Sequence, residues 1–133
     1  MMLRTKISRF LYNIFTYLVS PLLIIHLVFR SISDRRYINR IAERFGFYER
    51  HNNNETIWVH AVSYGEVNAA QSLVRSLLEE YPESKLIFTC TTPTASALIE
   101  DLFQDKVISV YMPYDLKGPV KRFFQWAKPK MAI

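Results

Sequence analysis

Residues 56–81 read TIWVHAVSYGEVNAAQSLVRSLLEEY, a short apolar run followed by an amphipathic one. The run at 56–62 is rich in β-branched and aromatic residues and predicts a buried strand. From residue 66 to 81 apolar side chains return at helical spacing, and Pro82 follows as a stop signal. A strand followed directly by a helix is the repeating unit of an α/β protein.

The same alternation continues to the end of the chain. Strands are predicted at 85–91, 107–112 and 131–133. Thr92 followed by Pro93 predicts an N-cap and the first residue of a helix to about residue 103, and Pro119 opens a third helix. We therefore expect an α/β class with a parallel sheet and helices on both faces. Because the chain stops inside a predicted strand, we expect the protein to continue beyond it.

Charge is distributed unevenly along the 133 residues, half of which are hydrophobic. The chain has 17 Lys and Arg against 12 Asp and Glu, and up to Arg50 the balance is nine basic to three acidic. This basic excess flanks an apolar run, which favours anionic lipid over nucleic acid as the partner. With a single Cys90 and three scattered histidines, we expect no disulfide, no metal site and a reducing compartment.

The apolar run at 10–29 contains thirteen Leu, Ile, Val or Phe and no charge. Those thirteen contribute about −4 to −8 kcal/mol to insertion at mid-helix, and the polar residues subtract several. Spanning is therefore favoured, but Pro21 and the polar residues leave open a helix that lies in the interface. A cleaved signal peptide fits less well, since the run is long and no small-residue cleavage site follows. The arginines after the run favour a cytoplasmic C-terminal side.

Residues 33–47 place apolar side chains at helical spacing with arginines elsewhere around the wheel, and Gly46 is a plausible C-terminal stop. This pattern predicts a basic amphipathic helix at the bilayer surface, or else a helix packed on the domain with a solvated basic face. We thus divide the chain into a membrane anchor at 1–31, an interfacial helix at 32–50 and an α/β domain at 51–133.

Ligands of open α/β sheets bind at the carboxyl ends of the strands, so three loops matter, at 60–66, 91–94 and 112–115. Glu66 begins a helix, where the dipole and free amides favour the ionised carboxylate that a general base needs, although such a Glu also serves stability alone. Ser63 could be a cap, and His60, in an apolar strand, fits a core histidine better than a functional one. The loop threonines could hold a phosphate or sugar, or need no ligand at all. We find no dinucleotide or P-loop motif and expect no cofactor.

The apolar amino-terminal segment and four motifs, in this order and spacing, resemble the bacterial 3-deoxy-D-manno-octulosonic acid (Kdo) transferases of lipopolysaccharide synthesis. The four motifs are ERFGFY at 43–48, WVHAVSYGEV at 58–67, TTPTAS at 91–96 and VYMPYDL at 110–116. Two residues depart from the family pattern: Tyr64 stands where a smaller aliphatic residue is usual, and Ala95 where glycine is usual. Neither change removes a chemical group. The resemblance implies the Rossmann-like N-terminal half of a GT-B glycosyltransferase fold, preceded by a membrane-embedded helix. The C-terminal nucleotide-sugar domain would lie outside this chain, which alone should be inactive.

The resemblance also implies an inverting, metal-independent transfer of Kdo from CMP-Kdo to a lipid A precursor at the cytoplasmic face of the bacterial inner membrane. Glu66 matches the family's proposed catalytic base. Substrate contacts would come from the loops and the basic segment, at Ser63, Gly65, Thr91, Thr92, Thr94, Arg35, Arg36, Arg40 and Arg44. A different class remains open, a membrane-tethered α/β binding or scaffold module in which Glu66 only starts a helix.

Overall fold

The computed structural model describes residues 2–49 and 55–133. A four-stranded parallel sheet forms its centre, in the order β3-β2-β1-β4. The strands are β1 (Thr56–His60), β2 (Lys85–Cys90), β3 (Ile108–Tyr111) and β4 (Pro129–Ala132). All four were predicted from the sequence. The first residues of the domain expected at 51–133, up to residue 54, lie outside the described residues.

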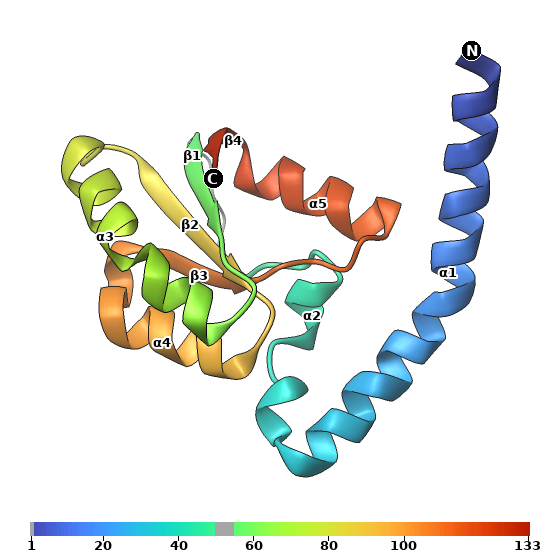
Figure 1. The fold of residues 1–133 in the computed structure, drawn as a ribbon, viewed down its shortest axis with the longest axis horizontal. Coiled ribbons are helices and arrows are strands. Elements are labelled where there is room, and N and C mark those ends of the chain that lie inside the picture. The colour runs from blue at the N-terminus through green and yellow to red at the C-terminus, as the bar shows by residue number, and fades with distance from the viewer. Residues whose placement is uncertain (1, 50–54) are drawn as a thin grey trace.

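Helices cover both faces of this sheet (Figure 1). The helices α3 (Tyr64–Glu80) and α4 (Pro93–Phe103) enclose the larger core together with one face, and a short 3-10 turn, η2 (Gln104–Lys106), follows α4. The helix α5 (Lys117–Ala127) covers the other face, where Phe123 packs against Ile87 and Val110. The α/β class and its layered architecture are thereby confirmed.

Successive strand residues explain this division, because side chains along a strand point alternately to opposite faces. Phe88 and Cys90 of β2 are fully buried toward α3 and α4, and Ile87 between them is fully buried toward α5. Thr92 caps α4 as predicted, with its Oγ1 accepting a hydrogen bond from Ala95 N at 3.3 Å. The nearly continuous apolar run of β2 therefore indicates a strand that is buried on both faces of the sheet.

The basic amphipathic helix predicted at 32–50 is wrong as one continuous helix. The structure has a 3-10 turn, η1 (Arg35–Tyr37), then a single helical turn, α2 (Ile41–Arg44). Asp34 starts the first turn by accepting from Arg36 N at 3.0 Å, and Arg40 interrupts the helical path with a left-handed backbone of φ 57°. The tertiary contacts of Arg40, described below, compensate for this unfavourable backbone.

Gly46 ends α2, as the sequence predicts. Its backbone is left-handed at φ +79°, and the amides of Gly46 and Phe47 return to Glu43 O at 2.8 Å and Ala42 O at 3.0 Å. This pair of hydrogen bonds is a Schellman motif. A Cβ at Gly46 would lie 2.5 Å from Pro119 O, so the turn also needs glycine for its close approach to α5.

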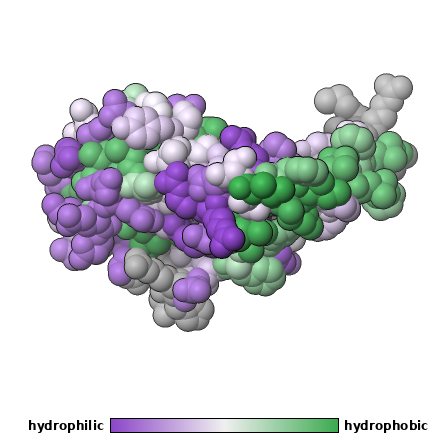
Figure 2. All heavy atoms as spheres, turned by 90° about the horizontal axis from the view of Figure 1, so that it is seen from below, coloured by the Kyte–Doolittle hydropathy of each residue, from purple (hydrophilic) through white to green (hydrophobic). Residues whose placement is uncertain are grey.

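The N-terminal helix α1 (Met2–Ser33) stands beside the α/β domain and bends along its course (Figure 1). Pro21 lies inside it, where the missing amide and the ring favour a kink. Residues 7–33 are long and apolar enough to cross a membrane, although a signal sequence would meet the same criterion. Only 6% of the apolar window is buried, and Figure 2 shows its hydrophobic surface running away from the largely hydrophilic domain.

Candidate functional site

The three loops selected from the sequence lie at the carboxyl edge of the sheet, and hydrogen bonds join them. Val62, after β1, is the first junction, because its carbonyl accepts from Thr91 N at 3.3 Å and from Thr91 Oγ1 at 2.8 Å. Thr91 directly follows β2. The loops after β1 and β2 are thus held together by the backbone of Val62.

Glu66 lies in the first turn of α3 and is exposed to solvent. Its Oε2 accepts a hydrogen bond from Val62 N at 2.6 Å. A bond of this kind from a backbone amide to a carboxylate is short and charge-assisted. It fixes the side chain at the mouth of the loop, and within the described residues we find no hydrogen bond to Oε1. The carboxylate is therefore oriented by the backbone on a residue that is exposed to solvent.

The residues just before Glu66 leave the site open. Ser63 occupies the N-cap position of α3 with an extended backbone, and its side chain makes no capping hydrogen bond. A Cβ placed on Gly65 would meet no heavy atom within 4 Å. Ser63 therefore does not cap α3 through its side chain, as the sequence had allowed, and a ligand has room to approach the first turn of α3.

The three threonines of the second loop have different surroundings. Thr91 uses its hydroxyl on Val62 O, and Thr92 uses its hydroxyl to cap α4. Thr94 is exposed, and its hydroxyl lies 3.3 Å from that of Thr92. Of the three, Thr94 is the hydroxyl most accessible to a ligand.

Arg44 of α2 connects the second and third loops through hydrogen bonds to both. It is only 4% exposed, and its Nη2 donates to Thr91 O at 2.9 Å. Its own carbonyl accepts from Tyr114 N at 2.8 Å, and its guanidinium lies 4.2 Å from the ring centroid of Tyr111. A buried arginine with these contacts holds the loops in place. Arg44, which the family resemblance suggested as a substrate contact, instead forms part of the scaffold of the site.

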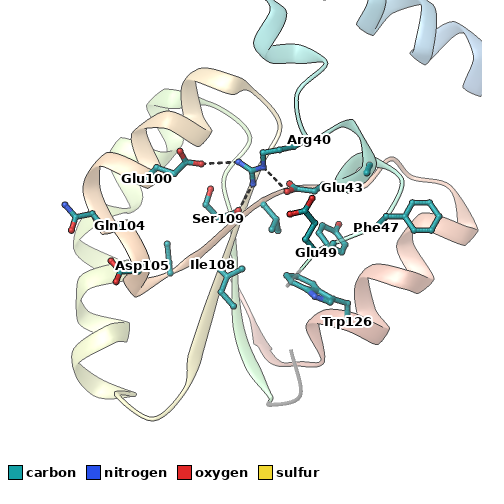
Figure 3. Close-up of a pocket in the computed structure, with 14 residues that line it drawn as sticks. Arg40, Glu43, Phe47, Glu49, Glu100, Gln104, Asp105, Ile108, Ser109 and Trp126 are labelled. Atoms are coloured by element: carbon teal, nitrogen blue, oxygen red, sulfur yellow. Dashed lines mark hydrogen bonds and ion pairs between the residues drawn. The ribbon is translucent and has the colours of Figure 1, made fainter. Parts of the chain in front are cut away.

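Arg40 is likewise engaged by the protein (Figure 3). Its guanidinium contacts Glu43 at 2.8 Å, Glu100 at 3.1 Å and the Ser96 hydroxyl at 2.9 Å. A further bond of 2.5 Å goes to the carbonyl of Ser109 on β3. Burial acts to lower the pKa of the Arg40 guanidinium, but the hydrogen bond and charge of Glu43, with the charges of Tyr111 and Glu100, outweigh it and raise that pKa. Arg40 therefore remains charged and fixed in place.

Arg40 and Glu43 together close the free edge of β3. Glu43 Oε2 accepts from Tyr111 N at 2.8 Å, and Tyr48 OH donates to Tyr111 O at 3.3 Å. Unpaired amides and carbonyls of an edge strand would otherwise attract another strand. The sequence analysis did not predict that residues 40–48 cover the edge of β3. The one signal that could have suggested it is the opposite charge of Arg40 and Glu43, three residues apart.

A cavity of about 470 Å³ lies along the same edge, between β3, α2 and Trp126 of α5 (Figure 3). The charged side chains around it are mainly acidic, at Glu43, Glu49, Glu100 and Asp105, with Arg40 as the basic member. This cavity was not predicted, because its walls come from segments that are distant in sequence.

Arg35 and Arg36 are the candidate arginines that remain exposed. Arg36 pairs with Asp34 at 2.8 Å, and that partner holds the pKa of the Asp34 carboxyl below its usual value. Both lie in η1, next to the end of α1. They are accessible to an anionic ligand in a way that Arg40 and Arg44 are not.

His60 is a histidine with internal partners. Its Nδ1 lies 2.9 Å from the hydroxyl of Thr89, which also accepts from Trp58 Nε1 at 2.8 Å. Thr89 is fully buried. The contacts fit the structural assignment that the sequence favoured. In the described part of the chain, no three His, Cys, Asp or Glu side chains gather as metal ligands.

The structure is thus an α/β domain with a parallel sheet. Its candidate ligand site lies at the carboxyl edge of that sheet and is formed by the loops after β1, β2 and β3. Residues 39–133 match the family model described as 3-deoxy-D-manno-octulosonic-acid transferase (kdotransferase). This chain belongs to that family and corresponds to its N-terminal region.

Individual relatives agree with this assignment. A 3-deoxy-D-manno-octulosonic acid transferase of Haemophilus influenzae is 38% identical over 127 residues, which cover 94% of this chain and 30% of the relative. A probable mitochondrial transferase of the same name from Arabidopsis thaliana is 32% identical, over 92% of this chain and 28% of the relative. One from Chlamydophila psittaci is 24% identical, over 98% and 31%. The chain thus spans about 30% of the length of these curated relatives, and no solved structure matches it.

Proposed function

We propose that this chain forms the acceptor-side region of a glycosyltransferase that transfers Kdo from CMP-Kdo to a lipid A precursor in lipopolysaccharide synthesis. The single observation that carries the proposal is Glu66, oriented by Val62 N at 2.6 Å and exposed at the carboxyl edge of the sheet. Membership of the Kdo transferase family supports the choice of donor and acceptor. Most of the nucleotide-sugar site would belong to the parts of the relatives that this chain does not span.

In this proposal Glu66 is the general base. It takes the proton from a primary hydroxyl of the acceptor as that oxygen bonds to the anomeric carbon of Kdo, and the bond from that carbon to the phosphate of CMP breaks. CMP leaves with the electron pair. A single displacement of this kind inverts the anomeric carbon and needs no metal. Inverted product stereochemistry and an unchanged rate in a chelator would support both points.

The neighbouring groups would orient the acceptor. Gly65 leaves space for a sugar ring, and Ser63 and Thr94 offer hydroxyls beside it. Arg35 and Arg36 would contact the acceptor phosphates, because they are exposed. We do not extend that assignment to Arg40 and Arg44, whose guanidinium groups are engaged by the protein. Thr91 and Thr92 would act by shaping the loop, since their hydroxyls already have partners.

The acyl chains of a lipid A precursor remain in the bilayer, so the enzyme must act at a membrane surface. The exposed apolar surface of α1 and the arginines that flank it support attachment to the bacterial inner membrane, with the α/β domain on the cytoplasmic side. The domain division that we propose is an attachment segment up to Ser33, a connecting segment of which residues 40–48 pack on the free edge of β3, and the α/β domain from Glu55 onward.

Glu66→Gln in the full-length protein tests the assignment. The amide keeps the shape of the side chain but cannot take a proton, so we expect transfer to fall by roughly 10²–10⁴-fold. Glu79→Gln, an exposed position near the end of the same helix, is the matched control and should retain activity. Circular dichroism should show both variants folded. Turnover close to that of the parent in Glu66→Gln would remove Glu66 as the base.

A further inference from the structure

Helix α1 contacts the α/β domain through two tyrosines in its N-terminal half, and its C-terminal end leads into η1. Tyr12 OH donates a hydrogen bond to Asp115 Oδ2, and Tyr17 OH accepts from Gly118 N at 3.3 Å. Asp115 and Gly118 lie in the loop after β3 and at the start of α5. The domain is therefore attached to α1 near its N-terminal third and again after Ser33.

The distance between these attachments is incompatible with a spanning helix. At 1.5 Å per residue, Tyr12 is about 30 Å from Ser33 along the helix axis, which is about the thickness of the hydrocarbon layer. If α1 crossed the bilayer with Ser33 at one surface, Asp115 would lie near the opposite surface. The loop after β3 and the start of α5 would then have to cross the lipid with it. Irregular backbone exposed to lipid is not tolerated there.

The side chains of α1 are divided between two faces. Among residues 7–33 the partly or fully buried positions recur mostly every three or four residues, and four of them carry small polar groups: Asn13, Thr16, Val19, Ser20, Leu23, Leu27 and Ser31. The opposite face is exposed and apolar, with Leu18 at 71% exposure and Phe15 at 64%. A helix of this kind fits an interface better than a bilayer core, where both faces would meet lipid.

Positive charge is placed at both ends of this apolar face. Arg9 is exposed near the N-terminal end, and Arg30, Arg35 and Arg36 are exposed at the C-terminal end. A helix that lies in the plane of an anionic surface brings both groups to the lipid headgroups at once. A crossing helix would leave one group on the side opposite to the domain.

We propose that α1 lies along the membrane surface, with its apolar face in the lipid interface and the α/β domain on its opposite face. This inference rests on the proposed membrane attachment and adds its geometry. The occupant of the apolar face is an anionic lipid surface. Because Tyr12 and Tyr17 bind the loop after β3 and the start of α5, the helix is joined to the same edge of the sheet that carries Glu66. An acceptor held by its acyl chains would thus meet that edge without leaving the bilayer.

Two aspartate substitutions separate the arrangements. Leu18 and Ser20 are two residues apart, so in a spanning helix Leu18→Asp and Ser20→Asp would place a charge at nearly the same depth. In an in-plane helix only Leu18→Asp puts the charge in lipid. We expect Leu18→Asp to weaken flotation with phosphatidylglycerol-containing vesicles by about tenfold or more, and Ser20→Asp by less than about twofold.

Equal losses in the two variants would overturn the in-plane arrangement while leaving membrane attachment intact. Full binding by both variants would instead contradict attachment through α1. The two failures are therefore distinguishable. Circular dichroism and the urea midpoint of each variant check that the α/β domain is still folded.

Cysteine labelling gives a second, independent measurement. Ser8 is exposed near the start of α1, Ser72 is exposed on α3, and the natural Cys90 is fully buried, so background labelling is low. In sealed inverted membrane vesicles, a membrane-impermeant maleimide should label Ser8→Cys and Ser72→Cys from the same, outer side. Labelling of Ser8→Cys only after the vesicles are opened would show that α1 crosses the bilayer.

Discussion

Two parts of one arginine-rich segment have opposite environments. The outer part, residues 34–37, forms a 3-10 turn in which Arg36 is 57% exposed and pairs with its neighbour Asp34. The inner part, residues 40–48, packs on the sheet edge, and Arg44 there is only 4% exposed. Similar residues at similar spacing thus serve different purposes. What separates them is their distance from the unpaired edge of β3.

The inner part shows how backbone groups decide the placement of a charged side chain. The carbonyl of Ser109 and the amide of Tyr111 lie on the free edge of β3 and need partners. Arg40 and Glu43 supply a donor and an acceptor at the required places. The outer part meets no such edge, and its charges stay in solvent. The following predictions test this contrast, from the largest expected effect on stability to the smallest.

Arg44→Ala should destabilise the protein most. It removes a buried cation, leaves Thr91 O without its donor and opens space beside Tyr111, so we expect the free energy of unfolding to fall by about 3 kcal/mol. Urea unfolding measures the change. Arg36→Ala, in the outer part, is the control, and its urea midpoint should equal that of the parent protein. Equal stability of the two variants would remove the distinction between the parts.

Gly46→Ala should destabilise by about 1–3 kcal/mol, because a left-handed backbone is costly for alanine and the new Cβ would press on Pro119 O. The inner part would then separate from α5. Gly65→Ala is the matched control, since a Cβ there meets nothing within 4 Å. Thermal unfolding of both variants compares them directly, and a loss in Gly65→Ala as large as in Gly46→Ala would contradict the packing argument.

Cys90 is a fully buried thiol whose pKa is affected by Arg40 and Arg44 of the inner part. Burial raises the pKa of its thiol to about 11, although Arg40 and Arg44 act in the opposite direction. A pKa raised in the folded state means that the native protein holds the proton more tightly than the unfolded chain does. The resulting stability is complete below the unfolded pKa and is lost as pH rises from about 9 to about 11. Urea midpoints across this range should fall, and they should fall less in Cys90→Ala.

A double variant, Arg35→Gln with Arg36→Gln, should leave stability unchanged within error. Both side chains are exposed, and surface ion pairs contribute little. Binding to anionic vesicles should nevertheless weaken several-fold, because two headgroup contacts are lost. Vesicle flotation at two salt concentrations measures this effect, and unchanged binding at low salt would argue against a lipid contact by the outer part.

Much of the α/β domain follows from local sequence. The strand at Thr56–His60, the capping of α4 by Thr92 and the stop at Gly46 were all predicted, because each depends on residues within one or two turns. The loops of the candidate site were predicted for the same reason, since they follow from where the strands end. The hydrogen bond from Val62 N to Glu66 was not predicted, because the backbone path of the loop sets it.

The sequence alone determined the order of strands and helices, the parallel sheet and the apolar character of α1, because periodicity and capping are local properties. Only the tertiary structure decided that Arg40 and Arg44 turn inward, that residues 33–47 form no single helix, and that Tyr12 and Tyr17 join α1 to the domain. These outcomes depend on partners about 50 to 100 residues away, such as Thr91, Ser109 and Asp115. A helical pattern in the sequence does not reveal such partners. The hydrogen bonds that these side chains make to backbone groups distant in sequence stabilise the fold by more than a continuous helix at 33–47 would.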